Sequence, residues 1–263
     1  MYKEKRNILL TLFLFLQIGL VQLASYHSEI VETYYSRGLY PYISGFLRYF
    51  FGWLEVSVGD LLYLFLIFLL LRLIYRFVKT PRAWKSHLLR LGAAVSLFYF
   101  AFYALWGLNY SRVPVAENLG LVHDAYEIEK LEDITQRILG RTQTLHKYLS
   151  AHDTLPVSPP YSREQILKMT ASGYKSLSEF LPQYTYSTPS IKNSVFSLPL
   201  TYMGFAGYLN PLTGEAQVDA LIPEISYAFT SSHEVAHQLG VAYENEANFI
   251  GFLAAAFHED PYF

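Results

Sequence analysis

The chain has 263 residues, 52% of them hydrophobic, and contains no cysteine, which excludes disulfide bonds, thiolate metal ligands and a cysteine nucleophile. The net charge of −2 conceals an asymmetry: the first 108 residues carry 11 Lys and Arg against 5 Asp and Glu, whereas residues 109–263 carry 9 against 17. The acidic second part has no basic cluster, which argues against nucleic acid as a partner. We expect a membrane region, residues 1–108, followed by one globular domain, residues 109–263.

Three apolar stretches predict transmembrane helices at about residues 8–24, 56–74 and 91–108. The first can also be interpreted as a cleaved signal peptide, but its end fits a cleavage site poorly, which favours an uncleaved anchor. Asp60 is expected to cap the second helix, a role favoured over that of a buried functional carboxylate, and Trp106 to lie at the membrane interface near the end of the third.

Basic residues precede the first stretch and fill the connection between the second and third. They are Lys3, Lys5, Arg6, Arg76, Lys79, Arg82, Lys85 and Arg90. The positive-inside rule places both segments in the cytoplasm, so three crossings place residues 109–263 outside it. The aromatic external segment, residues 25–54, fits either interfacial helices on the lipid bilayer or a compact loop packed on the spans.

The globular part alternates helical and strand-like patterns. Apolar periodicity predicts a helix over about 127–152 and another capped by Ser162 and Gln165, after an extended connection from Asn109 to about Tyr126. Strands are expected at 205–209 and 216–219, joined by a turn-rich loop. This hairpin is either structural or an edge that holds an extended peptide. The lone histidines of this part are expected on the surface: His123, His146 and His152.

The sequence Ser-Ser-His-Glu-Val-Ala-His at 231–237 contains an H-E-x-x-H motif. On a helix, His233 and His237 project from one face and can bind one metal ion, for which Zn²⁺ is the expected choice. Glu234 can reach a metal-bound water and act as general base. Thr230 or Ser231 is expected to cap this helix and Gly240 to end it in a left-handed conformation. The alternative is an ordinary helix with two surface histidines.

A third ligand is expected just after Gly240. Glu244 and Glu246 both lie close enough in sequence, and Glu244 is favoured because Asn248 follows it one helical turn later and can bond a ligand histidine. Glu224 and His258 are weaker candidates.

The motifs H-E-V-A-H and E-N-E-A-N are similar to those of gluzincin metallopeptidases. That resemblance implies an α+β, mostly helical, zincin-like domain with a small sheet. In it His233, His237 and Glu244 bind zinc, Glu234 is the base, and Asn248 hydrogen-bonds a ligand histidine. Asn248 departs from the aspartate found in many gluzincins, and the short spacer keeps Glu246 open as the ligand.

The chain also resembles an uncharacterised bacterial membrane family, domain of unknown function 3810. Three stretches carry this resemblance: Trp106–Tyr110, Phe196–Ala216 and His233–Phe249. It implies a location in the bacterial cytoplasmic (inner) membrane. It also implies that the family continues past Phe263, so that the chain is a fragment and the oxyanion-stabilising residue could lie beyond its end.

The expected function is a membrane-anchored zinc metallopeptidase that cleaves an extracytoplasmic protein or peptide. The alternative is a non-catalytic membrane receptor, sensor or scaffold with a structural or vestigial zinc site. Because the metal helix is polar and far from the spans in sequence, cleavage inside the membrane is not expected. The sequence indicates neither the cleavage specificity, nor endo- against exopeptidase action, nor the oligomeric state.

Overall fold

The computed structural model describes residues 2–121, 127–150 and 152–263. Among them, three helices are long and apolar enough to cross a membrane: α1 (Tyr2–Ser25), α4 (Val58–Lys79) and α5 (Trp84–Leu105). Each apolar stretch predicted from the sequence lies largely in one of them. The third helix ends earlier than expected, because Gly107–Ser111 forms a 3-10 turn.

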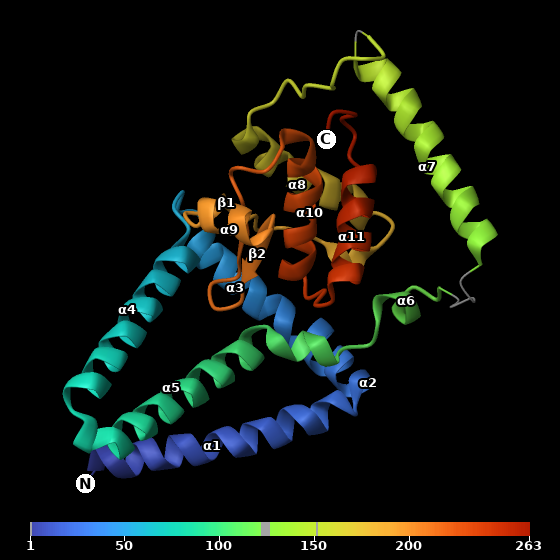
Figure 1. The fold of residues 1–263 in the computed structure, drawn as a ribbon. Helices are drawn as coiled ribbons and strands as arrows, with labels where there is room; N and C mark the ends of the chain where they lie inside the picture. Colours follow the sequence, from blue (N-terminus) through green and yellow to red (C-terminus); the bar gives the residue numbers. More distant parts are fainter. Residues whose placement is uncertain (1, 122–126, 151) are drawn as a thin grey trace.

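The three helices form a wedge (Figure 1). α1 and α5 lie side by side, with Gly92 of α5 so close to Thr11 that a Cβ would come within 2.7 Å of its side chain. Small residues allow such close packing between apolar helices. Gln17 of α1 also donates a buried hydrogen bond to Ser96 Oγ of α5 at 2.8 Å. By contrast, α4 meets α5 at the short connection between them and diverges from it toward the globular domain.

The aromatic segment is helical, comprising α2 (Ser28–Ile30), a π-helix (Val31–Leu39) and α3 (Tyr40–Gly52). One face packs against the globular domain, where Tyr40 and Ser44 donate hydrogen bonds to Gln238 O, a contact that neither interpretation includes. The other face exposes large aromatic side chains: Tyr42, Phe46, Tyr49, Phe50 and Trp53. The position of this face on a bilayer stays a prediction.

The predicted cap of α4 is wrong. Ser57 is the cap, because its Oγ accepts a hydrogen bond from the Asp60 amide at 3.0 Å. Asp60 is instead fully buried and accepts hydrogen bonds from Ser194 Oγ, the Val195 amide and the Tyr208 hydroxyl. The carboxylate therefore joins the start of the apolar helix α4 to the globular domain.

The globular domain is mostly helical. Its elements are α6 (Val115–Asn118), α7 (Ile128–Leu149), α8 (Arg163–Ser178), β1 (Ile191–Asn193), α9 (Ser197–Met203), β2 (Gly207–Asn210), β3 (Glu215–Val218), α10 (Glu224–Gln238) and α11 (Glu244–Ala256). The capping box of Ser162 and Gln165 is confirmed. The extended connection after Asn109 is wrong for its first part, which contains the 3-10 turn and α6.

The described strands form one sheet in the order β1-β3-β2. β2 and β3 are the predicted hairpin, shifted by a residue or two, whereas β1 was not predicted and pairs parallel with β3. α10 packs between this sheet and the pair α8 and α11, around the fully buried Tyr174, Val235 and Ile250. α7 stands apart with no buried residue (Figure 1). β2 is an edge strand, so one of its sides pairs with no other strand among the described residues.

Candidate metal centre

The H-E-x-x-H motif lies in the last part of α10. The helix begins at Glu224 after Pro223, not at Thr230 or Ser231, so the predicted cap is wrong. Pro223 suits a helix start because it has no amide hydrogen to leave unpaired. Ser231 is instead buried inside the helix, where its Oγ is hydrogen-bonded to Thr170 of α8 at 2.8 Å. Glu234 is therefore not engaged in capping.

Three of the predicted ligands converge. Glu244 Oε2 lies 3.2 Å from His233 Nε2, and Glu244 Oε1 lies 3.5 Å from His237 Nε2. One ligand atom from each residue falls within 4.8 Å of the others. Burial lowers the pKa of both imidazoles, which favours the neutral form that binds a metal.

The residues fit a zinc ion. Two ligand atoms about 2.1 Å from a tetrahedral ion are about 3.4 Å apart, close to the spacings between Glu244 and the two imidazoles. Two nitrogens and one carboxylate are also the ligand set of catalytic zinc sites that keep one position open.

A backbone carbonyl orients His237. The imidazole Nδ1 lies 2.7 Å from Val241 O, so a proton on Nδ1 leaves the Nε2 lone pair for a metal. The carbonyl is within reach because Gly240 turns the chain at φ 85°, the left-handed helix end that the sequence predicted.

His233 is held differently. Its Nδ1 is buried without a hydrogen-bond partner, although Asn248 lies near enough to influence the pKa of the imidazole. α11 approaches this residue closely at Gly251, where a Cβ would lie 2.8 Å from the His233 backbone. The role of Asn248 as a hydrogen-bond partner of His233 stays a prediction.

Glu234 is buried beside the edge strand. A Cβ on Gly207 of β2 would lie 2.7 Å from Glu234 Oε1, so this glycine gives the carboxylate its space. Glu234 Oε2 has no hydrogen-bond partner. Burial, with a contribution from the Glu244 carboxylate, raises the pKa of Glu234 well above its ordinary value. The Glu234 carboxylate, a group that can accept a proton, therefore lies next to the edge strand β2.

The other candidates lie elsewhere. Glu246 Oε1 accepts a hydrogen bond from the Val115 amide at 2.8 Å, and burial raises its pKa. Glu224 is at the opposite end of α10, and His258 Nδ1 accepts a hydrogen bond from the Asp260 amide. His146 is partly exposed and His152 exposed, while His123 lies outside the described residues.

Residues from the segments next to the apolar helices hold the C-terminal end of α10, and the sequence did not predict these contacts. Trp106 is buried, not interfacial, and its Nε1 donates to His237 O at 2.9 Å. Tyr40 and Ser44 of α3 donate to Gln238 O at 2.8 and 2.7 Å. Arg112 donates to Gly240 O at 2.9 Å. Helix ends leave carbonyls unpaired, so donors were needed here, but no local pattern identifies which residues supply them.

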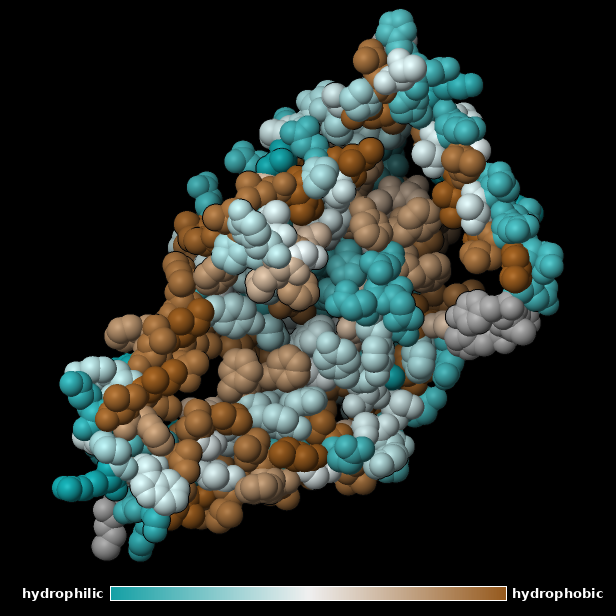
Figure 2. Space-filling view, in the orientation of Figure 1, coloured by the Kyte–Doolittle hydropathy of each residue, from teal (hydrophilic) through white to brown (hydrophobic). Residues whose placement is uncertain are grey.

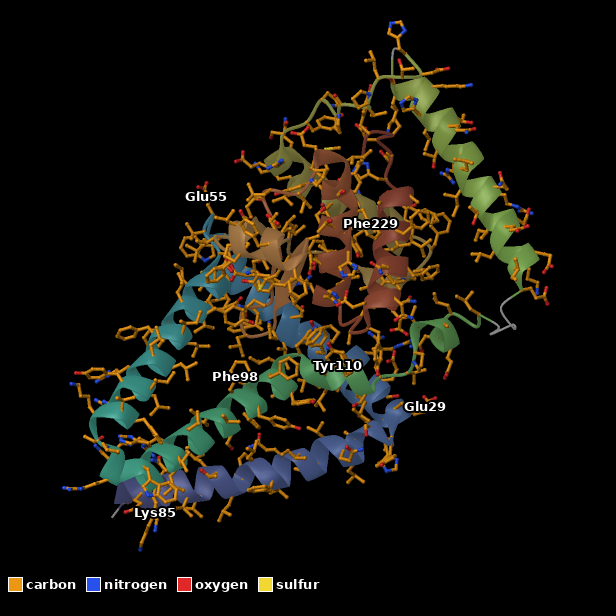
Figure 3. The ribbon with its side chains drawn as sticks, viewed as in Figure 1. Glu29, Glu55, Lys85, Phe98, Tyr110 and Phe229 are labelled. Carbon is orange, nitrogen blue, oxygen red and sulfur yellow. The ribbon has the colours of Figure 1, made fainter. Side chains whose placement is uncertain are left out.

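The cluster opens into a cavity of about 770 Å³ that the apolar helices α4 and α5 help to form. Its lining includes Tyr63 of α4 and Phe98 and Phe102 of α5, together with the motif residues. Figure 3 shows Phe98 on the side of α5 that faces the domain, Phe229 on α10, and Tyr110 just beyond the end of α5. The metal helix is far from the spans in sequence but shares this cavity with two of the apolar helices. That cleavage does not take place inside the membrane stays a prediction.

Comparison with known proteins gives one match. No curated protein and no solved structure matched the chain. A family model described as "Protein of unknown function (DUF3810)" matches residues 35–263, which include the aromatic segment from residue 35 on, two of the three apolar helices and the whole metal centre. The chain therefore belongs to the DUF3810 family.

Proposed function

We propose that the chain is a zinc-dependent metallopeptidase of the gluzincin type, anchored in a membrane, that hydrolyses peptide bonds of an extracytoplasmic protein or peptide. The observation that carries the proposal is the convergence of His233, His237 and Glu244 beside the buried Glu234. Zinc, when bound, supplies Lewis acidity that lowers the pKa of a water molecule and polarises the scissile carbonyl.

The protein's own groups supply the proton transfers and the substrate position. Glu234 accepts a proton from the attacking water and returns it to the leaving amine as the C–N bond breaks. The edge of β2 at Gly207 holds the substrate in an extended conformation through main-chain hydrogen bonds. Tyr110 lines the same cavity, and burial together with the nearby Glu244 raises its pKa. Its phenol stays protonated and serves as the hydrogen-bond donor to the oxyanion.

The charge distribution supports the proposed orientation in a bacterial cytoplasmic membrane. The start of α1 and the connection between α4 and α5 lie at one end of the membrane helices, and the globular domain lies at the other (Figure 1). The basic residues of the first end then face the cytoplasm, and the metal centre faces the opposite side.

A non-catalytic receptor, sensor or scaffold with a structural zinc site is the alternative. Structural zinc sites are closed by four protein ligands. Here the Glu244 side chain is 78% exposed, and the cluster found among the described residues has three members. An open ligand set beside a large cavity favours catalysis.

The test uses the full chain, purified in detergent or lipid nanodiscs. Wild type is expected to contain one equivalent of zinc and to cleave a peptide library. Glu234→Gln should keep the zinc but lose activity by roughly 10²–10⁴-fold, whereas His233→Ala should lose the zinc. A folded wild-type chain without zinc would sink the metal site, and equal activity in Glu234→Gln would sink the peptidase.

A further inference from the structure

The cavity at the metal centre continues into the membrane region. A second hollow of about 520 Å³ shares Tyr63, Phe98, Phe205 and Tyr208 with the metal cavity. It extends along α4 past Leu66 and Ile67 and is bounded on its other side by α9. We call this second hollow the α4–α9 groove. The two spaces adjoin, so a bound chain can run from one into the other.

The α4–α9 groove is apolar throughout. None of the described residues that line it is charged, and its domain side is built from Phe196, Pro199, Leu200 and Met203. A smaller hollow of about 210 Å³ lies further along α4 and α5, lined by Leu70, Leu73, Leu88 and Leu91 among others. In Figure 2 the surface is hollowed between α4 and α5, and hydrophobic residues border the hollow. A polar segment would lose its hydration in such a path, whereas an apolar segment can occupy it at no such cost.

The divergence of α4 from α5 gives this path an opening toward the bilayer. α1 packs on α5 and not on α4, so among the described helices no third membrane helix closes the space between α4 and α5 (Figure 1). α4 is instead fixed at its start, where Asp60 binds the Tyr208 hydroxyl. Strand β2 connects the two spaces, because its Gly207 lies next to Glu234 and its Tyr208 lines the α4–α9 groove.

From this geometry we propose that the substrate is a membrane-anchored polypeptide, cleaved next to the end of its apolar anchor. The anchor enters between α4 and α5 along Ile67 and Phe98, and the adjoining residues pair with β2 at the metal centre. A glycerophospholipid could fill the groove, but its ester-linked chains have no amide groups to pair with a strand and no peptide bond to hydrolyse. This inference rests on the proposed peptidase function, whose substrate class it names.

Because the chain contains no cysteine, a single introduced thiol can test whether the anchor enters between α4 and α5. Ile67→Cys places a single thiol in the groove, and Leu69→Cys places one on the same helix at a residue that is 38% exposed and does not line the groove. Each variant is reconstituted in phosphatidylcholine vesicles and treated with a bulky maleimide. The probes are peptides with about ten randomised residues joined to an apolar span of about 20 residues, and the same peptides without the span.

Untreated wild type should cleave the anchored peptides at least tenfold faster than the free ones. Maleimide labelling of Ile67→Cys should reduce cleavage of the anchored peptides at least tenfold and leave cleavage of the free ones unchanged, while labelling of Leu69→Cys should change neither. Equal cleavage of both probes, unaffected by the label on Ile67→Cys, would overturn the inference and leave the peptidase proposal standing.

A binding measurement separates the two proposals when no cleavage is seen. In a chain that combines Glu234→Gln with Ile67→Cys, an environment-sensitive fluorophore on the single thiol should shift its emission when the anchored peptides are added, and not when the free ones are. A shift without cleavage by the wild-type chain contradicts the peptidase function but keeps the binding site. No shift from the anchored peptides contradicts the entrance itself.

Discussion

The two sides of the H-E-x-x-H helix are held in opposite ways. At its C-terminal end, the carbonyls of His237, Gln238 and Gly240 all receive side-chain donors from residues 40–112. On the cavity side, His233 Nδ1 and Glu234 Oε2 are buried without partners, and Glu244 is mostly exposed. Buried polar groups are normally paired, so unpaired ones mark where a ligand or a reaction is expected. The fold fixes where the ligands lie and leaves open the groups that would react.

This contrast assigns a second role to the membrane region. The donors that hold the end of α10 come from α3 and from the turn after α5, which places the metal helix directly against the membrane-proximal segments. The region before residue 109 is therefore part of the frame of the metal centre, as well as the part that carries the apolar helices. We call the C-terminal end of α10, with the side chains that donate to its carbonyls, the held side. Substitutions on the cavity side should change metal binding and turnover, whereas those on the held side should first lower the free energy of unfolding.

The largest effect is expected from Glu244→Ala, with Glu246→Ala as its matched control. If the roughly 10–16 kcal/mol of zinc binding is shared among its ligands, losing one costs about 3–5 kcal/mol, or roughly 10²–10⁴-fold in zinc affinity. Glu246→Ala should keep stoichiometric zinc, since its carboxylate bonds the Val115 amide instead. Competition with a zinc-binding dye measures both. Loss of zinc in Glu246→Ala alone would reverse the ligand assignment.

Arg112→Met tests the held side. Arg112 pairs with Glu32 at 2.9 Å while donating to Gly240 O, so its removal leaves a buried carboxylate with Arg37 and Asn118. We expect the free energy of unfolding at pH 7 to fall by about 3 kcal/mol, the lower end for breaking a buried pair. Denaturant unfolding of the detergent-solubilised chain measures it, with zinc still bound under native conditions.

The loss of stability in Arg112→Met should depend on pH. Burial alone would raise the pKa of Glu32, but hydrogen bonding and charge from Arg112, then from Arg37, outweigh burial and lower it. A carboxyl group with a lowered folded-state pKa stabilises the protein above its ordinary value of 4.5 and loses this contribution as the pH falls through the folded-state value. The stability difference between wild type and Arg112→Met should therefore narrow as the pH falls below 4.5. A constant difference down to about pH 3 would contradict this account of the pair.

The sequence predicted the residues of the cavity side but not those of the held side. Local patterns were sufficient for the three apolar helices, the Ser162 capping box, the β2–β3 hairpin and the Gly240 turn, because each depends on residues close in sequence. The spacing of the motif also indicated the residues that meet on the cavity side. Helical geometry alone brings His233 and His237 onto one face.

The held side could not be predicted in this way. Trp106 and Tyr40 reach α10 across 131 and 198 residues, and nothing in their own neighbourhoods indicates a buried donor. Trp106 in particular ends an apolar stretch, where a tryptophan is typical of a membrane interface. The three-residue β1 is too short for a periodic pattern, and it forms because β3 offers a free edge. Tertiary contacts determined these features.

Gly207→Ala returns to the cavity side, where a smaller effect is expected. The added methyl group would lie 2.7 Å from Glu234 Oε1 and 2.6 Å from Gln217 O, so the strand and the carboxylate must move apart. We expect turnover to fall by roughly 10–100-fold with zinc retained, because a displacement of about 1 Å has effects of this size on catalysis. Gly140→Ala in α7 meets no atom within 4 Å and should leave turnover unchanged. Unchanged turnover in Gly207→Ala would remove the edge strand from the proposed mechanism.

Trp106→Phe should have the smallest effect. Phenylalanine keeps most of the packing against Phe102 and His237 but cannot donate to His237 O. That carbonyl still accepts a hydrogen bond from the Gly240 amide at 3.0 Å, so the loss should be about 1 kcal/mol, near the lower limit for a buried acceptor that loses one donor. If the held side only fixes the ligands, stability should fall while zinc affinity and turnover per zinc stay within about twofold. A fall of much more than twofold in turnover per bound zinc would mean that Trp106 also acts on the cavity side, where its ring borders the metal site.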